Sequence, residues 1–365
     1  MVRYGYACVN QTLTNRPKKL GGRITTSRTA RKASWYPDNL QLISDKALDN
    51  AKDLLSYLKW NEEHGITLFR VGSELFPWHD HYELHDLPGF EEIAYHLHAA
   101  GEFARQHGHR LTTHPGPFHV LGSPRQDVVE KSIIGLERHS EMFDLMGYEP
   151  SFENKINIHV AGAYGDREAT AKRWIKTWQR LSDSLKARLV LENDDKASMY
   201  SVRHLYELIH KEIGIPITFD YWHHTFCTGD LSEREAFFMA RSTWEKHGVT
   251  QCTHYSESRR NEKKAFLNEV CSKHGISWDE IDSWPTFAKF KKEFSKIKEP
   301  AHADYIVNTP NTYDVDSLDI VVEAKAKELA ILATELESKW LEVQAYKDNF
   351  ERLQSDCSER TSEVE

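Results

Sequence analysis

The 365-residue chain lacks several features that would each point to a particular class of protein. It has no apolar run long enough to cross a bilayer, and no hydrophobic stretch near its first residue of the kind found in secretory signals. Its five cysteines are odd in number and show no Cys-x-x-Cys spacing, which argues against a disulfide framework or a zinc finger. It also lacks a glycine-rich phosphate loop and an internal repeat. We therefore expect a cytoplasmic protein with no membrane partner.

Acidic residues are missing from the first 37 positions, although the chain as a whole carries a net charge of −9. These positions contain eight basic residues, so subtracting their +8 leaves −17 on the rest of the chain. Seven of the eight lie between residues 16 and 32, in a segment without apolar periodicity. The segment is equally well explained as a solvated loop or, beside a cluster of metal ligands, as a contact for phosphate.

Six of seven apolar or mixed segments that resemble buried strands end in a histidine or an acid. Burying an unpaired ionisable side chain costs several kcal/mol, so packing alone gives a core strand no reason to end this way. The recurrence indicates that these side chains converge on one site. The seven segments are Lys155–His159, Arg188–Glu192, Pro216–Asp220, Ile320–Glu323, Arg110–His114, Thr250–His254 and Thr67–Val71, the last with His81 ten residues further on.

Amphipathic segments with helical spacing alternate with these strands. Leu48, Ala51, Leu54, Leu55 and Leu58 show the three-and-four spacing of one helix face. With Arg3–Val9 as a first strand, eight strands and their helices predict a (β/α)8 TIM barrel, whose functional groups lie at the carboxyl ends of its strands. An open doubly wound sheet is the alternative, but it takes ligands from only two or three strand ends. The helical segments are 47–60, 89–106, 128–146, 167–185, 202–213 and 234–246.

Two segments exceed what a minimal barrel needs. Residues 258–300 are rich in lysine and aromatic residues and precede the last strand, and a helical pattern continues far beyond that strand. We expect one TIM-barrel domain at 1–335, with a basic loop at 15–34 and a helical insertion at 258–300. Residues 336–365 are expected to form a helical extension whose acidic end frays.

Nine residues at or near the strand ends are candidate metal ligands. A single pair such as Asp220 and His223 is more often a hydrogen-bonded core pair, but nine such residues on successive strands favour a cluster of divalent metals. Three metals need about this number of ligands if carboxylates bridge and water fills the open positions. A glycosidase needs two acids and few histidines, whereas a two-metal sugar isomerase or epimerase remains an alternative. The candidates are His81, His114, His159, Glu192, Asp220, His223, His254, His302 and Glu323.

Several motifs resemble those of one family of DNA repair enzymes. They are Ile156–Gly165, Leu191–Lys196, Phe219–Asp220 with His223-His224, His302–Tyr305, Val322–Lys325, His114-Pro-Gly with Phe118, and Arg3–Tyr6 with Asn10. Together they span roughly residues 1–257 and 301–335, and in them the chain resembles the UV damage endonucleases, whose barrel is related to endonuclease IV. The resemblance implies an enzyme with three metals, described with Mn²⁺ and with Zn²⁺ as the alternative. Such an enzyme cuts damaged double-stranded DNA directly 5′ to pyrimidine dimers and some other lesions, leaving a 3′-hydroxyl.

The chemistry of hydrolysis, the charge of the basic loop and, for residues such as Tyr6 and Asn10, the resemblance assign roles to individual residues. Glu192, Glu323 and His159 are expected to be catalytic, with Glu192 bridging two metals and orienting the hydroxide. Contacts with DNA are expected from the end of the first strand, from the loop after His114 and from the basic loop. The protein is expected to act as a monomer that associates with the nucleoid. The expected DNA-binding residues are Tyr6, Asn10, Pro117, Phe118, Arg28, Arg31 and Lys32.

The chain departs from the family pattern at two positions. Pro117 stands where the family usually carries a glutamine beside its aromatic wedge, and Cys252 stands where it usually carries a carboxylated lysine that binds metal. Cys252 is therefore either a thiolate ligand, which would favour zinc, or the cluster has one ligand fewer. These departures leave the range of lesions open, and they add a cleavage-impaired DNA-binding relative to the alternatives.

Overall fold

The computed structural model describes residues 1–283 and 285–335, which divide into two compact units. The first unit comprises Met1–Tyr255 and Pro310–Glu323, and the second comprises Ser256–Thr309 and the described residues from Ala324 onward. Within the described residues, no helix combines the length and hydropathy that a membrane span requires. The predicted extension at 336–365 lies outside the described residues.

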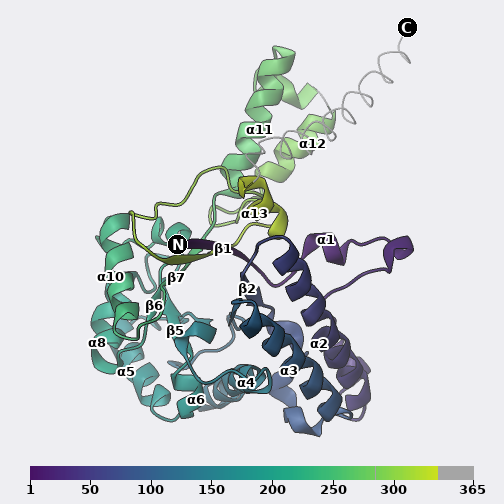
Figure 1. Cartoon of the computed structure of the whole chain (residues 1–365). Coiled ribbons are helices and arrows are strands. Elements are labelled where there is room, and N and C mark those ends of the chain that lie inside the picture. The colour runs from purple at the N-terminus through teal and green to yellow at the C-terminus, as the bar shows by residue number, and fades with distance from the viewer. Residues whose placement is uncertain (284, 336–365) are drawn as a thin grey trace. The chain divides into compact units, whose positions relative to one another are not determined.

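Eight parallel strands form the core of the first unit (Figure 1). They pair in the order β6-β5-β4-β3-β2-β1-β8-β7. The ring closes between β6 and β7, where Asp220 and His254 form a parallel bridge and the His254 amide donates to the Phe219 carbonyl at 3.0 Å. The predicted TIM barrel is therefore confirmed. The strands are β1 (Val2–Ala7), β2 (Leu68–Val71), β3 (Arg110–Thr113), β4 (Ile156–Ile158), β5 (Leu189–Glu192), β6 (Ile217–Thr218), β7 (Cys252–Tyr255) and β8 (Leu318–Val322).

The strands are short and buried on both faces. Every residue of β3, β4, β5 and β8 is buried, which is typical of parallel strands covered by helices. A cluster in the core joins Leu68, Val190 and Val321 of three strands to Trp244 of a covering helix. This packing holds the carboxyl ends of the strands at one rim.

Helices connect the strands and differ from the predicted segments mainly at two breaks. The segment 167–185 contains two helices because Ser182 caps the second, accepting a hydrogen bond from the Leu185 amide. The segment 202–213 contains a π-helical turn, η7 (Tyr206–His210), between two short helices. The helices are α1 (Gln11–Thr14), α2 (Leu40–Glu63), α3 (Phe90–Gln106), α4 (Gln126–Leu145), α5 (Arg167–Trp178), α6 (Asp183–Lys186), α7 (Val202–Leu205), α8 (Lys211–Ile213), α9 (Tyr221–His224) and α10 (Glu233–Glu245).

Single turns of 3-10 helix shape the loops that follow the strands. Three of them, η3 (Ser73–Leu75), η4 (His79–His81) and η5 (Leu84–Asp86), lie between β2 and α3. The basic loop contains η1 (Lys18–Leu20) and η2 (Lys32–Ser34), and η6 (Phe152–Asn154) precedes β4.

The second unit contains the segment that was expected to be a helical insertion. It holds α11 (Arg259–His274), η8 (Glu280–Ser283), α12 (Pro285–Phe294) and α13 (Glu328–Glu335). The unit has a small core of its own, against which Trp278 and Phe294 pack. The core residues are Phe266, Leu267, Val270, Cys271 and Ile281.

Candidate metal centre

Ionisable side chains from six neighbouring strands meet at the carboxyl-end rim of the barrel. Most of them lie at the carboxyl end of a strand or just after it, and parallel strands in a closed barrel bring these ends to the same rim. They are His114 after β3, His159 after β4, Glu192 at the end of β5, Asp220 after β6, His254 in β7 and Glu323 after β8, with His223 contributed by α9.

Glu192 lies at the centre of this rim and is almost completely buried. Four imidazoles surround its carboxylate, and the side-chain amide of Asn157 donates a hydrogen bond to Oε2. Glu192 is thus the residue that touches most of the others. Its Oε2 lies 3.1 Å from His114 Nε2, 3.2 Å from His254 Nδ1 and 3.8 Å from His159 Nε2, and its Oε1 lies 3.3 Å from His223 Nδ1.

Opposite charges offset the effect of burial at this rim. Burial opposes ionisation of Glu192, yet the imidazoles of His254 and His159 hold its pKa well below the ordinary range. Burial would likewise lower the pKa of His223, but Asp220 and Glu192 raise it to about 11. Burial raises the pKa of Asp220 to about 7, although His223 acts in the opposite direction. Without metal, the positive charge opposite these carboxylates therefore comes mainly from His159 and His223, whose pKa values are raised to about 9 and about 11.

Three overlapping groups at this rim have the composition of metal sites. Within each group one ligand atom per residue lies within 4.8 Å of the others. His254 Nε2 lies 3.2 Å from Lys155 Nζ, so this histidine offers only Nδ1 and can serve only one metal. Glu192 can bridge, because it has two oxygens. The groups are His114, Glu192 and His254; His159, Glu192 and His223; and Asp220, His254 and Glu323.

The residues present fit divalent metals. Asp220 Oδ2 is buried and makes no hydrogen bond, and such an atom is costly unless a ligand satisfies it. His159 Nδ1 and His254 Nδ1 lie 3.2 Å from carboxylate oxygens of Asp194 and Glu192, so nitrogen and oxygen donors already converge here. Imidazole nitrogen and carboxylate oxygen are donors that both Zn²⁺ and Mn²⁺ accept.

Two of the nine predicted ligands belong to none of these groups. His81 lies in η4, where its Nε2 is 3.3 Å from Lys32 Nζ and its ring packs among aromatic rings that include Trp35 and Trp78. Its placement does not support the expected role in the centre. His302 belongs to the second unit, where its backbone forms a bridge with Ser258.

Cys252 lies deeper in the barrel than the ligands. It is fully buried in the core cluster with Trp244 and Val321, and none of the groups among the described residues contains it. It precedes His254 by two positions on β7, so the two side chains share a face but stand about 6–7 Å apart along the strand. This placement does not support a thiolate contact with metal.

The residues predicted to contact DNA divide into buried and exposed ones. Tyr6 and Asn10 have no exposed surface; the Tyr6 hydroxyl donates to Asn61 Oδ1 at 2.7 Å, and the Asn10 amide donates to that hydroxyl at 3.0 Å. Asn10 also caps α1, so this placement does not support the expected contact with DNA. Pro117 and Phe118 are exposed, Phe118 to 85%.

Basic residues of the 15–34 loop also differ in their surroundings. Arg31 and Lys32 are exposed. The Arg28 guanidinium instead donates to Asp53 Oδ2 at 2.6 Å and to the Thr25 carbonyl. Arg28 thus ties the loop to α2, and its charge is already compensated.

Three polar residues of the rim were missed by the sequence analysis. Arg70 of β2 pairs with Glu323. Lys155 is fully buried, and its Nζ donates to Thr218 Oγ1 at 2.9 Å. Strand alternation was the available signal for Lys155 and Asn157, because residues at i−4 and i−2 share the face of His159.

A cavity of about 500 Å³ opens above the cluster. Arg70 and Lys196 bring positive charge to its lining, beside His114 and Glu192. Pro117 also lines it, so the cavity reaches from the cluster to the exposed loop after β3. Four carboxylates, those of Glu192, Asp194, Asp195 and Glu323, also line it, so a phosphate group would need bound metal to offset their charge.

The fold and the site define this protein as a TIM-barrel protein whose carboxyl-end rim carries a cluster of histidines and carboxylates that fits divalent metals. Within that class the chain belongs to the UV-endonuclease UvdE family, whose profile matches residues 2–350.

The chain is 33% identical over 336 residues to the UV-damage endonuclease of Schizosaccharomyces pombe, covering 90% of this chain and 49% of that protein. It is 31% identical over 297 residues to the UV DNA damage endonuclease of Clostridium perfringens, covering 80% of this chain and 66% of that protein. The crystal structure of SacUVDE matches with a TM-score of 0.68 and 27% identity, covering 92% of this chain and 99% of that one. The chain spans about half the length of its fungal relatives from Schizosaccharomyces pombe and Neurospora crassa.

Proposed function

We propose that this chain is a metal-dependent endonuclease that hydrolyses the DNA backbone 5′ to UV photoproducts and leaves a 3′-hydroxyl. The observation that carries the proposal is the set of overlapping ligand groups around Glu192 at the rim of a barrel of the UvdE family. The relatives that are called UV-damage endonucleases support the same substrate for this chain.

Seven residues would hold the metals. The resemblance to the UV damage endonucleases implies Mn²⁺, with Zn²⁺ as the alternative. Divalent cations at such a site neutralise phosphate charge and lower the pKa of water from 15.7 to about 7. Two of the three groups share His254, which can serve one metal only. The groups therefore support two metal positions that share no nitrogen, and a third position stays a prediction. The seven are His114, His159, Glu192, Asp220, His223, His254 and Glu323.

Other residues of the chain would bind and orient the DNA. Arg70 lines the cavity as the ion-pair partner of Glu323. Burial opposes its charge, but Glu323 raises its pKa, so Arg70 stays charged and would hold the Glu323 carboxylate in place beside the metal. Phe118 presents an exposed aromatic face next to this cavity. A photodimer is weakly paired and costs less to extrude than a normal pair, so a wedge such as Phe118 supports selection of damage without reading sequence.

Nicking of supercoiled plasmid tests the proposal. Untreated, UV-irradiated and depurinated plasmids are incubated with the protein and Mn²⁺, with a chelator as the control. Nicks that require both irradiation and metal support the proposal. A labelled duplex with one defined dimer then reports the position of the cut, and extension by a polymerase reports a 3′-hydroxyl. Tight binding without nicks would favour a cleavage-impaired relative. The absence of both DNA binding and nicking would favour a sugar isomerase or epimerase.

A further inference from the structure

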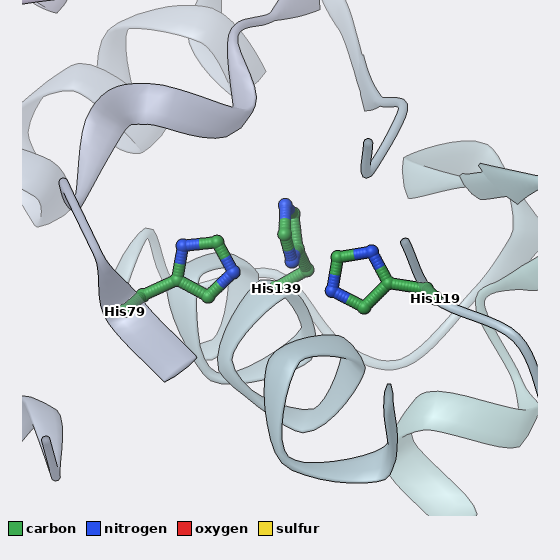
Figure 2. A group of neighbouring side chains, drawn as sticks. All are labelled: His79, His119 and His139. Atoms are coloured by element: carbon green, nitrogen blue, oxygen red, sulfur yellow. The ribbon is translucent and has the colours of Figure 1, made fainter. Parts of the chain in front are cut away.

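A second histidine cluster lies in the first unit and shares no residue with the groups around Glu192. His79 opens η4 after β2, His119 lies in the loop after β3, and His139 lies in α4. Figure 2 shows the rings of His79 and His119 on either side of the ring of His139. One ring nitrogen of each histidine lies within 4.8 Å of the others. The ring centroids are 4.6, 5.9 and 6.4 Å apart.

The same hydrogen bond fixes all three rings. Nδ1 lies 3.1 Å from the Phe76 carbonyl in His79, 2.9 Å from the Gly116 carbonyl in His119, and 2.8 Å from the Gly135 carbonyl in His139. Because a carbonyl only accepts, each Nδ1 carries the hydrogen and each neutral ring keeps its lone pair on Nε2. Histidines that bind metal typically donate their other N–H to such a carbonyl.

Two of the three lone pairs are buried without hydrogen-bond partners. His79 Nε2 and His139 Nε2 make no hydrogen bond, and leaving a buried polar atom unsatisfied costs about 1–3 kcal/mol. Burial lowers the pKa of His79 to about 4 and that of His139 well below its ordinary value. The rings are therefore neutral at physiological pH, which is the form that binds metal.

A glycine in α4 makes room for His119. A Cβ on Gly135 would come within 2.3 Å of His119 Nε2, so no larger residue fits while the ring stays in place. Glycine inside a helix costs about 1 kcal/mol relative to alanine. The helix thus contains an unfavourable residue at the position where the ring needs space.

The surroundings can balance an added cation. A cavity of about 970 Å³ is lined by His79 and His119 and also by the carboxylates of Glu74 and Asp80. Arg31 and Lys131 line it as well, and Arg138 acts electrostatically on His79. Arg138 is engaged by two carboxylates, those of Glu83 and Glu141.

We propose that His79, His119 and His139 form a separate site for one Zn²⁺ ion. Three neutral imidazoles match the ligands of zinc sites that keep a fourth position for water or another ligand, and this position would face the cavity. Zn–N bonds of about 2.0–2.1 Å place the nitrogens of a tetrahedral site about 3.4 Å apart, so nitrogens that lie within 4.8 Å of one another need only a small movement of the rings to bind one ion. The ion would tie the loops after β2 and β3 to α4, directly beside Phe118.

Zinc stoichiometry of the full chain tests this site independently of nicking. Metal-free protein is loaded with Zn²⁺, freed of excess ion, and analysed by inductively coupled plasma mass spectrometry. His79→Ala and His119→Ala should each bind one zinc ion fewer than His85→Ala, a control at an exposed histidine of η5. Circular dichroism of the metal-free variants checks folding. Equal zinc content in all three variants would overturn the proposal.

A variant that keeps all three histidines sharpens the test. Gly135→Ala should lose the same ion by displacing the His119 ring, whereas Ile134→Ala, at an exposed neighbour, should keep it. Glu192→Gln should also keep it while losing metal from the rim, which distinguishes the two locations. Retention of the ion by Gly135→Ala would mean that His119 does not bind metal from its observed position.

Discussion

Replacing Glu192 with glutamine removes one charge and one potential oxygen ligand while keeping the size of the side chain. Glu192 belongs to two of the three groups at the rim, so both of these groups should weaken together. We expect the rate of nicking to fall by at least about 10³-fold. At 1.36 kcal/mol per factor of ten, this is about 4 kcal/mol of barrier.

The same substitution has an independent effect on the metal-free protein. The folded-state pKa of Glu192 is depressed, so its ionised form contributes stability that is present above the unfolded pKa of about 4.3 and is lost as pH falls through the folded value. Thermal unfolding at pH 7 should therefore occur at a lower temperature in Glu192→Gln than in the wild type, and this difference should shrink in acid.

Initial nicking rates on irradiated plasmid, bound metal per chain and unfolding temperature are measured for the wild type and the variant. Glu168→Gln is the matched control, because it makes the same chemical change at an exposed carboxylate in the first turn of α5. The control should match the wild type in all three measurements. A Glu192→Gln protein with the wild-type rate and full metal content would refute the reasoning about this centre.

Four further predictions concern other parts of the first unit. Replacing Arg31 and Lys32 with alanine should weaken binding to damaged and undamaged DNA alike. The slope of log affinity against log salt should flatten by about 0.9 per lost phosphate contact, and an unchanged slope would mean that these residues do not contact phosphates. Arg28→Ala should instead lower the unfolding temperature, because its charge is already paired within the fold. Cys252→Ala should leave bound metal unchanged in mass spectrometry, since its sulfur belongs to the core; loss of one ion would make it a ligand. In metal-free protein, the raised pKa of His223 contributes stability that is full below about pH 6.5 and is lost as pH rises toward about 11, so the difference in unfolding free energy between wild type and His223→Gln should shrink over this range.

The sequence alone was enough to predict the barrel and most of its rim. Short apolar runs such as Leu189–Leu191 are typical of strands in a parallel sheet, because helices bury both faces of such a sheet. Each run ends at a polar residue, and closure of the sheet brings all these ends together. Seven of the nine predicted ligands therefore fall into the three groups. Alternation along β4 could also have identified Lys155 and Asn157, which the sequence analysis missed.

Only the tertiary structure decided what the loops and the barrel interior do with their side chains. Of the two histidines in η4, the sequence analysis chose His81; a left-handed backbone at Trp78 turns His79 toward α4 instead, and no periodicity reports such a turn. Tyr6 is buried because Asn61 of α2 meets its hydroxyl, a contact between residues 55 positions apart. The three-histidine cluster has the same origin, since its members come from three elements and meet only because the chain folds them around one helix.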